Sequence, residues 1–286
     1  MFAAMKGLQW LVLLAASTTF SRPSTTSTTS TTSTPTTFGK PSTAQLFEIG
    51  DMLLTAEQVP MMLRPKFGLE ELPSLTESSP GVRDERLRWP QGILNYDLSN
   101  VASSEHKDLI KNTLSKLETK LDSCIRFREA NTGFRVLVKE VGGCSSVVGY
   151  QGLWSPSQNL SLGSGCWGAA TIEHEFYHAI GVHHTQCRTD RDKYVKIIEE
   201  NIKEDFEGQF AKFDKSEVSE FGLPYDFESV MHYGANDYGK DGKRTIETYD
   251  PSKQDIIGKA QGVSDGDIML VKKMYNCDGK KLIKYI

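Results

Sequence analysis

The chain has 286 residues, of which 38% are hydrophobic, 9% aromatic and 24% charged, and its formal net charge is −4. This length suits one substantial domain with processing segments, and the apolar content is enough to build its core. The charge pattern offers neither a basic stripe for nucleic acid nor a long acidic tail, so we expect no nucleic-acid partner.

Residues 1–17 have the three-part pattern of a cleaved signal peptide. Lys6 supplies the positive charge, the apolar run 8–16 is too short to span a bilayer, and small residues end it. The Ser/Thr-rich segment 21–37 follows, and its composition predicts disorder, which argues against the alternative of a buried N-terminal helix. No other stretch is a transmembrane candidate. We therefore expect a secreted, extracellular protein without a membrane span.

The elements predicted next mix strands and helices. Four prolines favour a poorly ordered region over 61–81, and regular structure is expected from Trp89 onwards. Apolar spacing and residue type predict the following elements in chain order: a strand over 93–98, a helix over 105–123 capped by Ser103 or Ser104, a strand over 134–141, a Gly- and Ser-rich loop, and helices over 169–180 and 192–206. The rest is turn-rich. This order of elements predicts an α+β domain with an irregular C-terminal half.

The decisive motif lies on the helix predicted over 169–180. His174 and His178 are four residues apart, so their imidazoles lie on one face, one turn apart. Gly181 can end the helix in a left-handed conformation and reverse the chain, which brings His184 back as a third ligand. Three protein ligands leave room for water, as in a catalytic Zn²⁺ site, and Glu175 is placed to act as the general base on that water.

Chance is the main alternative explanation of this motif. A bare H-E-x-x-H occurs in unrelated helices, but the pattern here extends to H-E-x-x-H-x-x-G-x-x-H. The chain has only six histidines, and four of them fall within 174–184. Core packing does not explain such clustering. The spacing alone leaves His183 open as the third ligand in place of His184.

The extended motif is the metzincin signature, and its surroundings resemble the astacin family of zinc metalloendopeptidases. The runs Arg188–Asp192 and Tyr225–Tyr233 resemble the astacin forms of the segment after the third histidine and of the Met-turn. The resemblance covers about 89–277. It implies a zincin-like two-subdomain catalytic domain of the α+β class, with a twisted mixed sheet plus helices above the cleft and an irregular lower half. It also implies a Zn²⁺ cofactor and hydrolysis of protein or peptide substrates.

The resemblance also assigns roles to single residues. Met231 would lie beneath the zinc site, and Tyr233 would be a mobile zinc ligand that also stabilises the oxyanion. The four matching cysteines would pair as Cys124–Cys277 and Cys144–Cys166. The segment Cys144–Val147 resembles the rim strand on which the family lays its extended substrate. Tyr233 and these cysteines favour an astacin over an adamalysin or a matrix metalloprotease.

Two positions depart from the family pattern. Thr185 follows the third histidine, where the family usually has a glutamate that contacts the N-terminus of the mature enzyme, so this contact cannot be carried over. Cys187 is additional, either as a buried free thiol or as half of an intermolecular bridge. A non-catalytic secreted binding protein is a further alternative, but no ligand and no general base is lost.

Phe47–Asp51 resembles the propeptide motif of the family, in which an aspartate occupies the zinc. Asp51 is the matching carboxylate, with one residue more than the usual spacing; an ordinary Gly-Asp turn is the alternative. We therefore expect a signal peptide over 1–17, a propeptide over 18–80 and a catalytic domain over 81–286. An activating protease would cut between about 77 and 84. Asn159, in the only N-glycosylation sequon, is expected in a polar loop.

Overall fold

A computed structural model describes residues 45–69, 81–82, 84–213 and 218–277, which all belong to one contact unit, Pro41–Ile286. The predicted signal peptide, the Ser/Thr-rich segment and most of the predicted cleavage region lie outside these residues. Within them, no helix has the length and apolar character needed to cross a membrane.

A seven-stranded mixed sheet forms the framework of the domain. Its strands, in spatial order, are β1 (Leu46–Ile49), β2 (Met52–Thr55), β7 (Cys144–Val147), β8 (Gln158–Leu162), β6 (Val136–Lys139), β4 (Ile93–Asp97) and β5 (Arg126–Glu129). The pairs β1–β2 and β7–β8 are antiparallel, and the other neighbours are parallel. The predicted strands over 93–98 and 134–141 are confirmed as β4 and β6.

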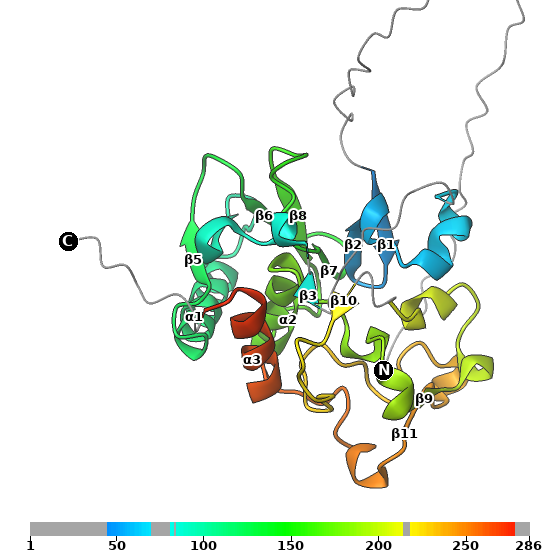
Figure 1. Ribbon diagram of the computed structural model, residues 1–286. Helices are drawn as coiled ribbons and strands as arrows, with labels where there is room; N and C mark the ends of the chain where they lie inside the picture. Colours follow the sequence, from blue (N-terminus) through cyan, green and yellow to red (C-terminus); the bar gives the residue numbers. More distant parts are fainter. Residues whose placement is uncertain (1–44, 70–80, 83, 214–217, 278–286) are drawn as a thin grey trace, which may run out of the picture. The chain divides into compact units, whose positions relative to one another are not determined.

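Two helices, α1 (Ser104–Lys120) and α2 (Ala169–Ala179), pack on each other and against strands of this sheet (Figure 1). Ser103 caps α1 by accepting a hydrogen bond from the His106 backbone N–H at 3.2 Å, as predicted. The apolar face of α1 is buried through Ile110, Leu114 and Leu117. The helix ends three residues before the predicted boundary. Together with a third helix, α3 (Asp265–Met274), these elements confirm the α+β class.

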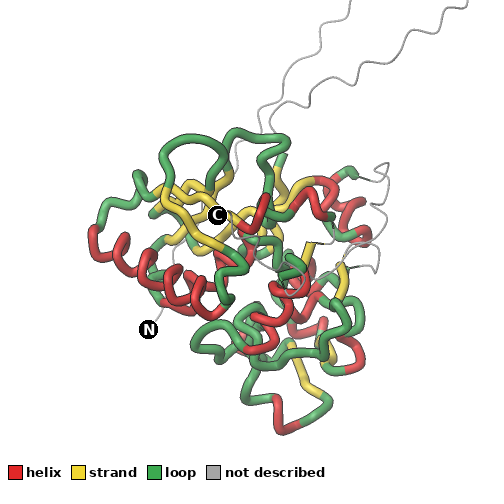
Figure 2. The backbone as a smooth tube through the Cα atoms, turned by 60° about the vertical axis from the view of Figure 1, so that its left-hand side comes forward, coloured by secondary structure: helices red, strands yellow, loops and turns green. Residues whose placement is uncertain are grey.

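The chain after α2 is mostly loops, short strands and single helical turns, as expected (Figure 2). Two small sheets pair β3 (Gly81–Val82) with β10 (Val218–Ser219) and β9 (Val195–Ile197) with β11 (Ile246–Thr248). The 3₁₀ turns of the described chain are η1 (Ala56–Gln58), η2 (Met61–Phe67), η3 (Glu85–Leu87), η4 (Pro90–Gly92), η5 (Thr185–Cys187), η6 (Arg191–Lys193), η7 (Glu199–Asn201), η8 (Glu207–Phe210), η9 (Lys240–Gly242) and η10 (Pro251–Lys253).

Several predicted elements are wrong. The helix predicted over 192–206 is instead η6, β9 and η7, because the β-branched residues of β9 pair with β11 some fifty positions later. The Gly- and Ser-rich loop contains β7 and β8, and the sequon residue Asn159 lies within β8, opposite Leu137 of β6, not in a loop. Its glycosylation stays a prediction. Regular structure also begins well before Trp89, with β1, β2 and η2, whose first turn precedes Pro65.

The cysteines pair as expected. Cys124 is bonded to Cys277 and Cys144 to Cys166, with Cα–Cα distances of 5.6 and 5.7 Å. The first bridge joins the chain after α1 to the residues after α3. The second holds the first residue of β7 against the segment that leads into α2. Cys187 is a buried free thiol.

Candidate metal centre

The helix α2, which carries His174 and His178, ends as the sequence predicts. Gly181 has φ of 103°, and its backbone N–H donates to the His178 carbonyl at 2.8 Å. The next N–H, of Val182, donates to the Tyr177 carbonyl at 2.9 Å. This pair of bonds is a Schellman motif, which satisfies the last helical carbonyls while the chain reverses. His184 thereby returns to the face of α2 that carries His174 and His178.

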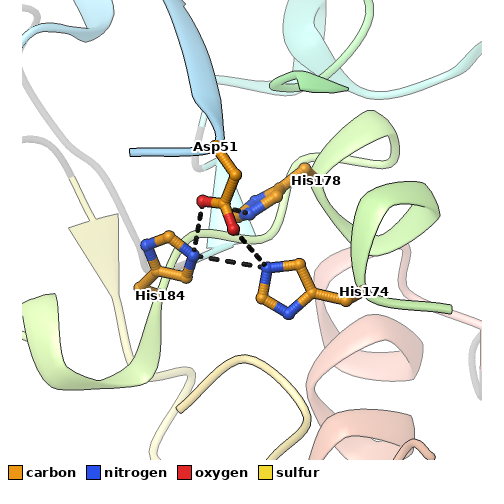
Figure 3. Close-up of side chains that lie close together, drawn as sticks. All are labelled: Asp51, His174, His178 and His184. Atoms are coloured by element: carbon orange, nitrogen blue, oxygen red, sulfur yellow. Dashed lines mark hydrogen bonds and ion pairs between the residues drawn. The ribbon is translucent and has the colours of Figure 1, made fainter. Parts of the chain in front are cut away.

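The three predicted histidines converge on the carboxylate of Asp51 (Figure 3). Their Nε2 atoms lie 3.2 Å (His174), 3.5 Å (His178) and 2.9 Å (His184) from the nearest Asp51 oxygen. The four ligand atoms all lie within 4.8 Å of one another. The neighbouring His183 is not part of this cluster, since its ring packs on Phe213 with 4.5 Å between centroids. The structure thus brings together His184, and not His183, with the helical pair.

The histidines are oriented for a metal ion. Nδ1 of His174 donates to the Val230 carbonyl at 2.8 Å, and Nδ1 of His178 donates to the Val182 carbonyl at 2.7 Å. A carbonyl can only accept, so these bonds hold a proton on Nδ1 and turn Nε2 towards the centre. Among the described residues, the buried Nε2 of His178 has no hydrogen-bond partner. Three converging imidazole nitrogens and one carboxylate oxygen are a ligand set that fits Zn²⁺.

Burial and charge shift the pKa values in this cluster in opposite directions. Burial lowers the pKa of His174, but its hydrogen bond and charge interaction with Asp51 raise the pKa to about 9. Burial lowers the pKa of His178 to about 3. Burial raises the pKa of Asp51, but the three histidines together hold it well below its usual range. Asp51 is therefore an anion at the centre of the three imidazoles.

Glu175 lies beside this cluster with 1% of its surface exposed, and its Oε2 has no hydrogen-bond partner among the described residues. Burial raises its pKa well above the usual value, His174 opposes this shift, and the Asp51 charge adds to it. A carboxyl group with a raised pKa is a better proton acceptor than an exposed one. Its position and environment suit the role of general base.

The predicted Met-turn lies against both ends of the histidine motif. Met231 is fully buried, and its carbonyl accepts the backbone N–H of Thr185 at 2.9 Å, while the Val230 carbonyl binds His174. Asp267 of α3, a residue that sequence reasoning missed, holds the Met-turn in place. Its carboxylate accepts the Ser229 hydroxyl at 2.6 Å and the Val230 N–H at 2.9 Å.

Thr185, which departs from the family pattern, joins this network. Its hydroxyl donates to the Ser229 hydroxyl oxygen at 2.9 Å, and Ser229 passes the contact on to Asp267. The serine hydroxyl also accepts the Met231 backbone N–H at 3.0 Å. Thr185 thus has a structural function in this chain, as a support of the Met-turn.

Tyr233 lies beside the third histidine, with 4.5 Å between its ring centroid and that of His184. Its backbone N–H donates to the side chain of Gln186 at 3.1 Å, which fixes its main chain. Its hydroxyl is buried and has no hydrogen-bond partner of good geometry among the described residues. Burial raises the pKa of this phenol well above its usual value, and the Asp51 charge and the Tyr238 phenol add to the shift. The phenol is therefore a proton-bearing donor.

Asp51 reaches the centre from the turn of the β1–β2 hairpin. Gly50 has φ of 68°, which permits the tight turn, and β2 extends the sheet by pairing in parallel with β7. The Ser146 backbone N–H donates to the Asp51 carbonyl at 2.8 Å. The buried Phe47 and Ile49 alternate with the exposed Leu46 and Glu48 along β1, and the apolar character of Leu46 hides this alternation in the sequence. The apolar side of the hairpin joins the main core.

Comparisons with known proteins agree with this centre. The family model described as Astacin, a peptidase family, matches residues 81–276. Low choriolytic enzyme of Oryzias latipes is 40% identical over 197 residues, which cover 66% of this chain and 69% of that protein. Blastula protease 10 of Paracentrotus lividus is 32% identical over 237 residues, which cover 80% of this chain but only 38% of that protein.

A solved structure gives the same result. The hatching enzyme zinc-protease High choriolytic enzyme 1 from Oryzias latipes superposes with a TM-score of 0.61 at 32% identity, covering 68% of this chain and 96% of that one. The family model spans the whole catalytic motif, the Met-turn and every cysteine except Cys277. The chain therefore belongs to the astacin family of zinc metalloendopeptidases.

Proposed function

We propose that this chain is a secreted zinc-dependent endopeptidase that is made as a latent precursor. The observation that carries the proposal is the convergence of Asp51 with His174, His178 and His184 within 4.8 Å. The histidines supply the metal site of a catalytic centre, and the aspartate fills the position that a water molecule needs. One geometry thus supports both the activity and its restraint.

Each side chain has a defined task in hydrolysis. The three histidines would hold Zn²⁺ through Nε2, and Zn²⁺, when bound, supplies Lewis-acid polarisation of a water molecule and of the peptide carbonyl. Glu175 would accept a proton from the attacking water and deliver it to the leaving amine. The Tyr233 hydroxyl would donate a hydrogen bond to the oxygen of the attacked carbonyl as negative charge develops there. Met231 and Asp267 would act through the position of the Met-turn.

Latency would come from the tethered carboxylate. A carboxylate oxygen is a competent zinc ligand, and tethering raises its effective concentration, so it can exclude water from the site. Residues 1–17 would be the signal peptide, 18–80 the propeptide and 81–286 the catalytic domain. An activating protease would cut between about 77 and 84 and end the tether. The natural substrates would be proteins or peptides.

The test uses the mature protein and a quenched fluorescent peptide, with zinc measured by atomic absorption. The wild type should bind one zinc and cleave the peptide. Glu175→Gln should retain zinc but lose hydrolysis, because it removes the proton acceptor and no ligand. Near wild-type turnover in this variant would overturn the assignment of the general base.

Latency is tested on the uncleaved precursor, with processing blocked and checked by gel. The wild-type precursor should be silent, and Asp51→Ala should hydrolyse the peptide before any cleavage. Equal silence of the two precursors would assign latency to steric cover by the propeptide and not to the Asp51 carboxylate.

A further inference from the structure

The turn of the hairpin covers two polar side chains of the segment after α2. A Cβ atom built on Gly50 would clash with Gln209 Oε1 and would lie 2.7 Å from the Tyr233 hydroxyl. Both groups therefore lie next to Gly50 and leave no room for a side chain there. The propeptide also reaches the neighbouring residue, since a Cβ on Gly208 would meet the Leu63 side chain at 3.6 Å. The turn η8 is thus a surface on which the propeptide lies.

Neither covered group has a hydrogen-bond partner of good geometry. Gln209 Oε1 and the Tyr233 hydroxyl are buried without one among the described residues. A buried polar atom without a partner is unfavourable, and such atoms in a native protein call for an explanation. For the Tyr233 hydroxyl, the proposed contact with the attacked carbonyl is such an explanation. The mechanism proposed above gives none for Gln209.

The hydrogen bonds that hold the Gln209 main chain do not involve its side chain. Its N–H donates to the Phe206 carbonyl at 3.0 Å, and its carbonyl accepts from the Cys187 thiol at 3.7 Å. These main-chain contacts fix the residue, while its side-chain amide faces Gly50 with an unpaired oxygen. A fixed main chain that positions an unpaired polar group meets the requirement that a binding group be preorganised.

The location of Gln209 indicates what it binds. Gly50 immediately precedes Asp51, so the Gln209 amide lies next to the residue that enters the metal centre. We propose that, in the mature enzyme, the Gln209 side-chain amide hydrogen-bonds the main chain of an extended peptide substrate next to the scissile bond. An amide both donates and accepts, as a peptide main chain does, so the contact would hold the chain in register whatever its side chains are. This inference rests on the proposed function.

The experiment compares mature wild type, Gln209→Ala and Gln209→Glu on quenched peptides. Gln261→Ala is the matched control, because the Gln261 side chain is exposed and donates to the nearby Lys259 carbonyl, far from Gly50 in the chain. Gln209→Ala should lower kcat/KM about 3- to 10-fold, the effect of one hydrogen bond, while Gln261→Ala leaves it unchanged. Gln209→Glu keeps an acceptor but loses the donor, and so tells which of the two the substrate uses. Zinc content and thermal unfolding should match the wild type in all variants.

Substrate analogues separate a substrate contact from an indirect effect. In each analogue one amide near the scissile bond, but not the scissile bond itself, is replaced by an ester, which removes an N–H and weakens a carbonyl acceptor. At the contacted position, the losses from the ester and from Gln209→Ala should not multiply. If they multiply at every position, Gln209 acts through Tyr233 and the inference is overturned. Unchanged kcat/KM in Gln209→Ala also overturns it, whereas a zinc-loaded wild type without activity overturns the proposed function itself.

Discussion

Gly50→Ala tests whether the turn of the β1–β2 hairpin holds the precursor closed. An L-residue in the left-handed conformation of Gly50, with φ of 68°, costs roughly 1–2 kcal/mol. The new Cβ would also clash with Gln209 Oε1 and lie 2.7 Å from the Tyr233 hydroxyl, an overpacking that adds roughly 1–3 kcal/mol. The hairpin can relieve both costs by leaving the site, so the substitution should favour the open precursor.

Gly68 provides the matched control for this substitution. It has φ of 69°, and a Cβ built on it meets nothing within 4 Å, so Gly68→Ala carries the backbone cost without the overpacking. The difference of roughly 1–3 kcal/mol corresponds to about 5- to 150-fold more open precursor for Gly50→Ala.

The assay is hydrolysis of a quenched peptide by uncleaved precursors, with processing blocked and verified by gel. We expect the rate to rise from wild type to Gly68→Ala and much further to Gly50→Ala. If Gly50→Ala is no more active than Gly68→Ala while both retain zinc and fold, then close contact at the turn does not maintain latency.

Three further outcomes can be measured, two at the metal centre and one at the buried Cys187. His184→Ala should lower both zinc content and activity, and full zinc in the purified variant would implicate His183 or another residue as the third ligand. Tyr233→Phe should keep zinc but lower kcat by about 10²–10³, the usual effect of losing one oxyanion donor, and an unchanged kcat would reject that role. Burial raises the pKa of Cys187 to about 12 from 9.0, so at pH 8 its thiolate fraction is about a thousandfold lower. A thiol reagent at pH 8 should therefore label Cys187 only in the denatured protein, and rapid labelling of the folded protein would contradict the burial.

The metal centre can be read from the sequence because its determinants are local. Two histidines four residues apart need only a helix to share a face, and a glycine three residues after the second histidine needs only the left-handed conformation to reverse the chain. The same holds for α1, whose cap and apolar spacing lie within one segment. Where one segment carries both the residues and the geometry that positions them, periodicity and spacing are enough.

The errors fall where the partner is distant in the chain. The local sequence around Val195 and Ile197 is compatible with a helix, but pairing with the distant β11 makes this segment a strand. The strand β8 escapes prediction because it is polar: Gln158 is buried in the sheet, where its side chain donates to the carbonyls of Val147 and Gly149. Asp267 supports Ser229 across 38 residues without any local motif. None of these relations can be read from a window of neighbouring residues.

The pairing of β2 with β7 has a consequence for handling the protein. The Ser146 and Val148 backbone N–H groups donate to the carbonyls of Asp51 and Leu53, so in the proposed precursor the hairpin shields the edge of β7. Loss of the hairpin would leave these donors open to any extended chain, including one from a second molecule. We expect the mature enzyme to aggregate and digest itself more readily than its precursor. The precursor is therefore the form to purify, concentrate and store.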